Sequence, residues 1–227
     1  MWLRKINVHN VASFSLVEAL LSLLLGSMLL FTFSYFYTDI LLNQTKQREL
    51  SHLQMRAQQL LTYMNKHIQH IGYRAIPKGN SNFSLFLKEE KYSHSLNHPQ
   101  CLIFFYDLNQ DGCLGKAKTS CAIGEVNNTT ELAKEIFGFK FEQNTIYAYR
   151  GNEFNKCTKE QCQTLLLDCD KAWEKFMDNV DYKVTQLHFS WIITDKLLRV
   201  ELELASVTQP EITYHSTMES YILNSGD

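Results

Sequence analysis

Proline and charge are both scarce in the first third of this 227-residue chain. The whole sequence has three prolines, and the first of them is Pro77. Between residues 14 and 38 the only charged residue is Glu18. Because proline interrupts helices and charge is disfavoured in hydrocarbon, these two absences permit one unbroken helix long enough to cross a bilayer.

Cysteine is missing from the first hundred residues and appears six times after them. An even number of cysteines confined to the part that follows a membrane segment indicates disulfides in an oxidising compartment. Six cysteines allow fifteen pairings. The short spacings favour two pairs and leave a third: Cys113–Cys121, Cys157–Cys162 and Cys101–Cys169. A zinc site at the last three cysteines is the weaker alternative, because tight Cys-x2-Cys knuckles are absent.

Signatures of catalysis are also missing from the sequence. It has no glycine-rich phosphate loop, nucleophile elbow or paired-carboxylate motif, so we expect no enzyme and no cofactor. His67 and His70 could share a metal at helical spacing, but such a pair is more often solvated. Without Arg4 and Lys5, the 22 basic residues become 20 against 24 acidic ones, with no basic run that interleaves aromatics. Nucleic-acid binding therefore stays open without being favoured.

The amino terminus has the charge pattern of a membrane anchor. The first thirteen residues contain Arg4 and Lys5 and no acid, which predicts a cytoplasmic amino terminus. The apolar segment that follows carries Glu18, and an ionised carboxylate in hydrocarbon costs about 2–3 kcal/mol. We expect the compensating charge to come from another molecule. A cleavable secretory signal fits less well, because the small residues Gly26 and Ser27 lie inside the apolar run rather than after it. A plain anchor with a stray acid is the other alternative.

The basic leader, Ser13 and the sequence Phe14-Ser-Leu-Val-Glu18 together resemble the class III signal of type IV prepilins and pseudopilins. The resemblance implies cleavage between Ser13 and Phe14 by a prepilin peptidase, which then methylates the new amine of Phe14. Ser13 departs from the glycine usual at that position. Glu18 would occupy the fifth mature position, where its carboxylate can pair with the Phe14 amine of a neighbouring subunit during assembly.

The rest of the chain predicts an α+β fold. Apolar residues recur at three- and four-residue steps from Leu50 to Ile71, with Gly72 and Pro77 as stop signals, so we expect the helix to continue as an amphipathic element. The expected strands are 101–106, 136–141, 145–149, 184–193, 197–205 and 214–222. The predicted divisions are a leader at 1–13, a transmembrane helix at 14–38, an amphipathic helix at 39–76 packed on an antiparallel β-sheet, and a disulfide-bonded β-rich domain at 77–227.

The stretch from Asp107 to Gly112 has two interpretations. Asp107, Asn109 and Asp111 followed by Gly112 match the first half of a calcium-binding loop. Lys118 stands where such a loop needs a bidentate glutamate. A tight turn after a strand, built from residues that tolerate turn backbones, is therefore the favoured interpretation.

Three further segments resemble the larger minor pilins of the PilW type, also called prepilin peptidase-dependent protein B: Gly72-Tyr-Arg74, Tyr106-Asp-Leu-Asn-x-Asp-Gly112 and Cys169-Asp-Lys-Ala-Trp173-Glu. The resemblance implies a single-pass inner-membrane protein with a periplasmic body, incorporated into a type IV pilus near its tip. Its implied partners are major and minor pilins, the prepilin peptidase and the inner-membrane assembly platform.

The implied role is to prime or cap a pilus that serves DNA uptake in natural transformation, motility or adhesion. A J-type pseudopilin of type II secretion and a tip adhesin or DNA-binding pilin are the alternatives.

Overall fold

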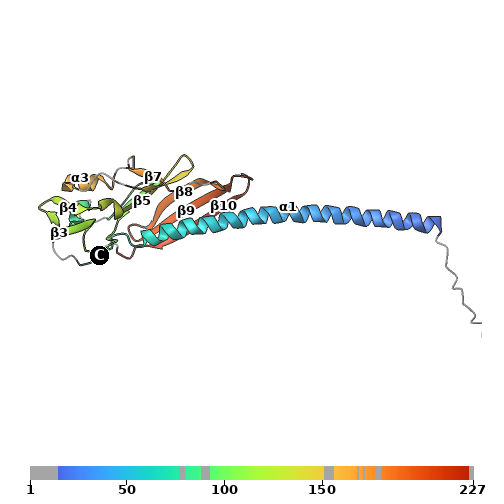
Figure 1. Ribbon diagram of the computed structural model, residues 1–227, viewed down its shortest axis with the longest axis horizontal. Coiled ribbons are helices and arrows are strands. Elements are labelled where there is room, and N and C mark those ends of the chain that lie inside the picture. Colours follow the sequence, from blue (N-terminus) through green and yellow to red (C-terminus); the bar gives the residue numbers. More distant parts are fainter. Residues whose placement is uncertain are drawn as a thin grey trace, which may run out of the picture. The chain divides into compact units, whose positions relative to one another are not determined.

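The computed structural model describes residues 15–76, 80–87, 93–150, 156–167, 169–170, 172–176 and 180–224 (Figure 1). The predicted cleavage residues Ser13 and Phe14 lie outside the described residues. The chain divides into two compact units, residues 1–48 and 49–227, which we describe separately.

The first unit is the amino-terminal part of α1, a helix that spans Leu16–Ile68. Its apolar side chains are exposed along the whole stretch from Leu16 to Leu42. The polar side chains here donate hydrogen bonds back to the helix: the hydroxyls of Ser22, Ser27 and Thr32 each reach a backbone carbonyl three residues earlier, at 2.8–2.9 Å. Because these donors are satisfied within the helix, they do not need water.

The second unit begins with the rest of α1, which has one buried stripe. Leu53, Ala57, Leu60, Met64 and Ile68 are buried, as the periodicity predicts, and Leu61 is buried beside them. Leu50 was predicted to belong to this stripe and is exposed instead. The buried core does not extend as far as Leu50. The neighbouring Glu49 accepts a hydrogen bond from Ser206, which is the last residue of β9 (Leu197–Ser206).

The helix ends at Ile68, eight residues earlier than the sequence predicts. His70 and Ile71 donate backbone hydrogen bonds to residues three positions back, so the chain tightens into turns. Gly72 then takes a φ of +74°, and its N–H donates to Phe105 O at 3.0 Å. A Cβ at this position would lie 2.7 Å from Ser93 Oγ, so both the backbone angle and the close approach require glycine.

The body contains two main antiparallel sheets rather than the single sheet expected. The first has the order β1-β2-β5-β6-β7, formed by His94–His98, Cys101–Phe105, Ile136–Glu142, Thr145–Tyr149 and Trp173–Lys175. The second has the order β10-β9-β8, formed by Thr213–Tyr221, Leu197–Ser206 and Tyr182–Ile193. A two-stranded sheet pairs β3 (Lys116–Ile123) with β4 (Val126–Thr130). Short helical segments are α2 (Phe83–Phe86), η1 (Leu132–Lys134) and α3 (Lys159–Thr164).

Two hydrophobic clusters hold these layers together. The larger one joins the buried stripe of α1 to inward residues of both main sheets, among them Phe104, Phe139, Phe189 and Val200. The smaller one covers the opposite face of the five-stranded sheet with α2, α3 and four of the six cysteines. Strand β2 is buried on both faces, which explains why Cys101–Phe105 is an unbroken apolar run.

Candidate assembly site

Glu18 and Ser15 form a reciprocal capping box at the start of α1. Ser15 N donates to Glu18 Oε2 at 3.1 Å, and Glu18 N donates to Ser15 Oγ at 3.2 Å. The two contacts satisfy two of the backbone N–H groups that every helix leaves unpaired at its first turn. The pattern Ser-x-x-Glu was readable in the sequence, but its role as a cap only becomes clear once the helix is known to begin at Leu16.

The position of Glu18 at the start of α1 also determines which charged groups lie close to its carboxylate. The positive end of the helix dipole lies at this first turn and favours a carboxylate there. Within the described part of the first unit, the next charged residue is Asp39 and the first cation is Lys46. Lys46 is 28 residues away, about 42 Å along the axis at 1.5 Å per residue. The described part of this unit therefore has no cation that can neutralise Glu18.

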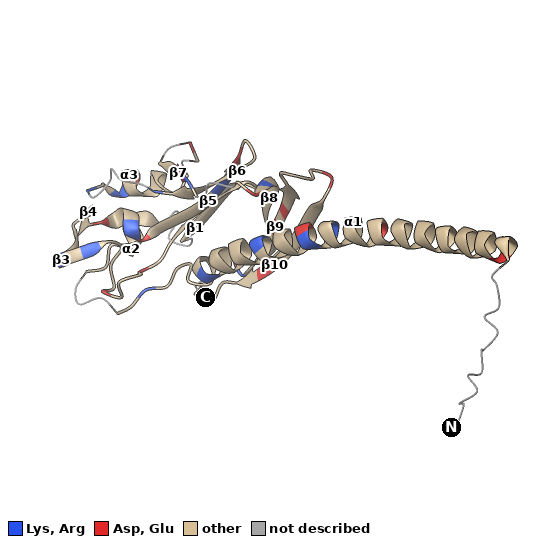
Figure 2. Cartoon of the chain, turned by 45° about the vertical axis from the view of Figure 1, so that its right-hand side comes forward, with Lys and Arg blue, Asp and Glu red and all other residues tan. Residues whose placement is uncertain are grey.

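The helical segment around Glu18 has the properties of a membrane anchor. Among the described residues, α1 is the one helix long and apolar enough to cross a bilayer, and none of that apolar window is buried within the chain. In Figure 2 this part of α1 is almost free of coloured residues. The segment fits a single-pass anchor.

The six cysteines form three disulfides within the second unit: Cys101–Cys169, Cys113–Cys121 and Cys157–Cys162. These are the same three pairs that the cysteine spacings in the sequence favour. The longest link joins β2 to the segment before β7, with 6.3 Å between its Cα atoms. No cysteine is left as a thiol, so the zinc alternative has no thiolate ligands. His98 lies beside the Cys101–Cys169 pair, but oxidised sulfurs offer no metal site either.

His67, in the last turn of α1, and His70, just after the helix, do not converge on a shared metal position. His67 Nδ1 lies 2.8 Å from Tyr106 Oη, while His70 Nδ1 lies 2.6 Å from Lys66 O. Burial lowers the pKa of His67, with Lys66 and His70 adding to the effect. The two Nδ1 atoms therefore have different hydrogen-bond partners, although both rings pack near Tyr106.

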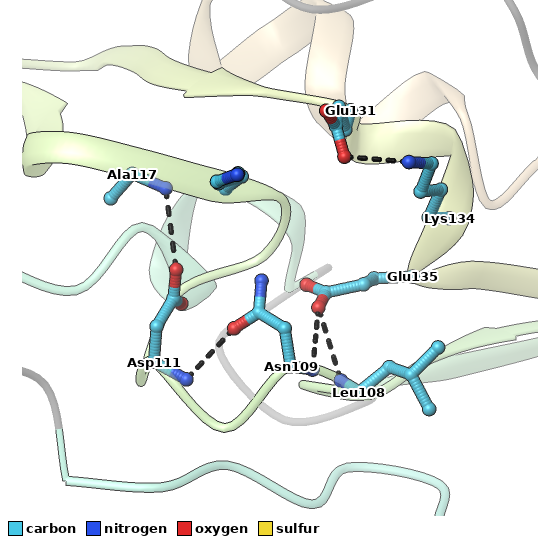
Figure 3. A pocket seen from close by; sticks show the side chains of 8 residues that line it. Leu108, Asn109, Asp111, Ala117, Glu131, Lys134 and Glu135 are labelled. Carbon is cyan, nitrogen blue, oxygen red and sulfur yellow. Dashed lines mark hydrogen bonds and ion pairs between the residues drawn. The ribbon is translucent and has the colours of Figure 1, made fainter.

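The Asp107 loop follows β2 and is closed by its own side chains. Asp107 Oδ2 accepts hydrogen bonds from Gly112 N at 2.8 Å and from Ala75 N at 3.0 Å. A residue that the sequence did not indicate, Glu135, also packs on the loop and accepts backbone hydrogen bonds from it (Figure 3). Glu135 is 28 residues from Asp107 along the chain, and no local spacing rule connects them.

Comparison with known proteins supports the prediction of a pilin-like protein, and it does so through a part of the chain that lies outside the amino-terminal motif. A family model described as prepilin peptidase-dependent protein B matches residues 46–222. An uncharacterized protein of Haemophilus influenzae strain Rd is 32% identical over 194 residues, which cover 77% of this chain and 82% of that protein. No solved structure matches. The family match begins after the amino-terminal motif, so the two lines of evidence do not rest on the same residues. The chain belongs to the prepilin peptidase-dependent protein B family.

Proposed function

We propose that this protein is a minor pilin that primes or caps the assembly of a type IV pilus. The observation that carries the proposal is Glu18, a carboxylate in an exposed apolar helix whose nearest described cation is Lys46. The family match supports it, because the family is pilus-related and typically has no enzymatic activity. Association with other pilus components and with a membrane follows from the same family relationship.

In the proposed mechanism, a prepilin peptidase cuts between Ser13 and Phe14 on the cytoplasmic side and methylates the Phe14 amine. The new positive charge then pairs with Glu18 of an adjoining subunit. Two opposite charges buried together are far less unfavourable than one alone, and removing one partner of a buried pair costs about 3–5 kcal/mol. Because an unpaired buried charge is so unfavourable, a subunit assembles stably only at the membrane depth where its Glu18 meets the neighbouring amine.

The capping box gives Glu18 a role before assembly as well. The hydrogen bond from Ser15 N keeps the carboxylate over its own helix terminus, close to where cleavage would create the amine. A carboxylate that is already oriented loses less side-chain entropy when the neighbouring amine arrives. The same residue would then cap the helix in the free subunit and align the subunit in the filament.

Two features support a low-copy position near the tip over a place in the repeating shaft. The body, residues 49–227, is a large unit with two main sheets, and it carries three disulfides. Disulfides persist in the periplasm, which agrees with a cytoplasmic amino terminus next to Arg4 and Lys5. The body would therefore lie on the periplasmic side.

The experiment that tests this function replaces the native gene with Glu18→Gln and Glu18→Ala variants. Glutamine can keep the capping contact, because its side-chain oxygen still accepts a hydrogen bond, but it has no charge. We expect both variants to be inserted and cleaved, and both to lose co-purification with other pilins and most surface filaments seen by electron microscopy. Full filament numbers with Glu18→Gln would contradict the charge pair.

Deletion of the gene separates pilus assembly from type II secretion. We expect the deletion strain to lose surface filaments and to secrete its extracellular enzymes normally. Loss of secretion with normal filaments would contradict a pilus role.

A further inference from the structure

We propose that the loop from Asp107 to Gly112 binds one calcium ion through the side-chain oxygens of Asp107, Asn109 and Asp111, with Glu135 holding the loop in shape. The sequence alone favours a simple turn here, because Lys118 replaces the glutamate expected at the twelfth position of the motif. Four structural observations change that interpretation.

The first observation is that the three oxygen-bearing side chains all fold back onto the loop. Asp107 Oδ2 accepts from Gly112 N at 2.8 Å, Asn109 Oδ1 accepts from Asp111 N at 2.9 Å, and Asp111 Oδ1 accepts from Cys113 N at 2.9 Å. Gln110 and Gly112 have φ values of +61° and +81°, which turn the backbone around these side chains. The bonds tie each of the three side chains to nearby backbone N–H groups, and Figure 3 shows one of them, from Asp111 N to Asn109 Oδ1.

The second observation is a buried oxygen without a hydrogen-bond partner. Asp107 is 1% exposed, and its Oδ1 atom is buried and accepts no hydrogen bond. Its other oxygen, on the same carboxylate carbon, accepts hydrogen bonds from Gly112 N in the loop and from Ala75 N. Leaving such an acceptor unsatisfied costs about 1–3 kcal/mol, and more when it is charged. A cation at this loop would satisfy it.

The third observation is an excess of negative charge at the loop. Glu135 is 2% exposed and accepts from Leu108 N at 3.1 Å, Asn109 N at 3.0 Å and Gly115 N at 2.6 Å. Three carboxyl groups therefore gather at one loop.

The fourth observation concerns the cations nearby. Lys116 and Lys134 line a pocket of about 430 Å³ together with Asn109, Asp111 and Glu135. Lys134 Nζ is bonded to Glu131 Oε2 at 2.7 Å. Among the described ion pairs, neither lysine contacts Asp107, Asp111 or Glu135. No described ion pair with these lysines therefore neutralises the carboxylates of the loop.

The chemistry of the ligand atoms indicates which metal ion the loop would bind. Every candidate ligand atom is an oxygen, which suits a hard cation and not zinc or copper. Calcium accepts irregular geometry and several carboxylates, whereas magnesium prefers a near-ideal octahedron and keeps its waters. The expected dissociation constant is on the order of 0.1–1 mM, the range of extracellular calcium modules.

A bound ion at this loop would reinforce the end of α1. Asp107 N donates to Tyr73 O at 2.9 Å, and Asp107 Oδ2 accepts from Ala75 N at 3.0 Å. Both partners belong to the segment that directly follows α1 in the second unit. Calcium would therefore stabilise the attachment of this segment to β2.

The test is isothermal titration of the full-length protein in detergent with calcium chloride, after treatment with a chelator. We expect one ion per chain, a rise in Tm at millimolar calcium, and at least a tenfold weaker response to magnesium. The absence of heat and of any Tm shift at 10-fold above the expected dissociation constant, about 10 mM calcium, would overturn the proposal.

Two variants locate the site. Asp111→Asn keeps an oxygen that can accept from Cys113 N and should weaken calcium binding about tenfold or more. Glu160→Gln removes the same charge from an exposed position in α3 that does not line the pocket, and it should bind calcium within about twofold of the unmodified protein, since a distant surface charge adds only weak, screened attraction. Equal affinities for Asp111→Asn and the unmodified protein would place the ion elsewhere and overturn the assignment.

Discussion

The side-chain amide of Asn82 donates a hydrogen bond to Asn127 Oδ1 at 2.6 Å, and neither residue is more than 1% exposed. Asn82 precedes α2 and Asn127 lies in β4. Asn82 also bonds both backbone groups of Leu114, each at 2.8 Å. One buried amide thus connects three segments that are 13 to 45 residues apart in the sequence.

We predict that Asn82→Ala destabilises the second unit by about 2–4 kcal/mol, because it leaves several buried polar groups without partners. Thermal unfolding followed by circular dichroism measures this. Asn80→Ala, at an exposed position two residues earlier, should change Tm by less than a degree or two. Equal effects of the two variants would show that the amide network contributes little.

Removal of Cys101–Cys169 should destabilise the protein more than removal of Cys113–Cys121. The two links span 68 and 8 residues, and in the chain-entropy model the longer loop contributes about 2 kcal/mol more. All four cysteines are buried, so the cavities left by paired alanine substitutions are comparable. Denaturant unfolding of the two double-alanine variants compares them, and an equal loss would contradict the entropic ranking.

Gly72→Ala should destabilise the end of α1 by about 2–3 kcal/mol. The added Cβ would meet Ser93 Oγ at 2.7 Å and Asn224 O at 3.0 Å, on a backbone whose φ is already +74°. Gly124 is a matched control, since its φ is +60° and nothing lies within 4 Å of the position of a Cβ. Gly124→Ala should lose only about 1 kcal/mol from backbone strain. Equal Tm shifts would mean that the close contact is relieved without loss.

Acidification should destabilise the fold through His94, a buried residue between β1 and the β8–β9 turn. His94 Nε2 lies 3.1 Å from Asp195 Oδ1, and its ring packs on Trp191 at 4.8 Å. Burial lowers the pKa of His94, against a smaller raising effect of the Asp195 hydrogen bond and charge. Because the folded pKa is below the unfolded value of 6.5, the neutral ring stabilises the fold above pH 6.5, and that stability is lost as the pH falls through the folded pKa.

His94→Gln should therefore reduce the loss of stability between pH 7 and pH 5. Urea unfolding followed by tryptophan fluorescence measures it. His67, whose pKa is also lowered, contributes a separate loss in the same direction, so the variant should flatten the profile only in part. His215→Gln changes an exposed histidine and is the control. A profile for His94→Gln that coincides with that of the unmodified protein would contradict the assignment.

Much of the fold could be predicted because its signals are local. The hairpins β5–β6 and β8–β9 have short turns and alternating apolar residues, so their pairing follows from neighbouring residues. Strands β3 and β4 were not predicted because they are polar, and Asn127 and Thr129 are buried by hydrogen bonds instead of by apolar packing. The separation into two main sheets has no local signal at all.

The amino-terminal motif was determined by the sequence itself. The leader charges, the apolar run and Glu18 follow one another along the chain, so their spacing is visible in the sequence without knowledge of the tertiary structure. The carboxyl cluster was decided only by the tertiary structure, because Glu135 reaches the Asp107 loop through the pairing of β2 with β5. Whether an oxygen such as Asp107 Oδ1 lacks a partner depends on every segment folded around it, and no pattern along the chain records that.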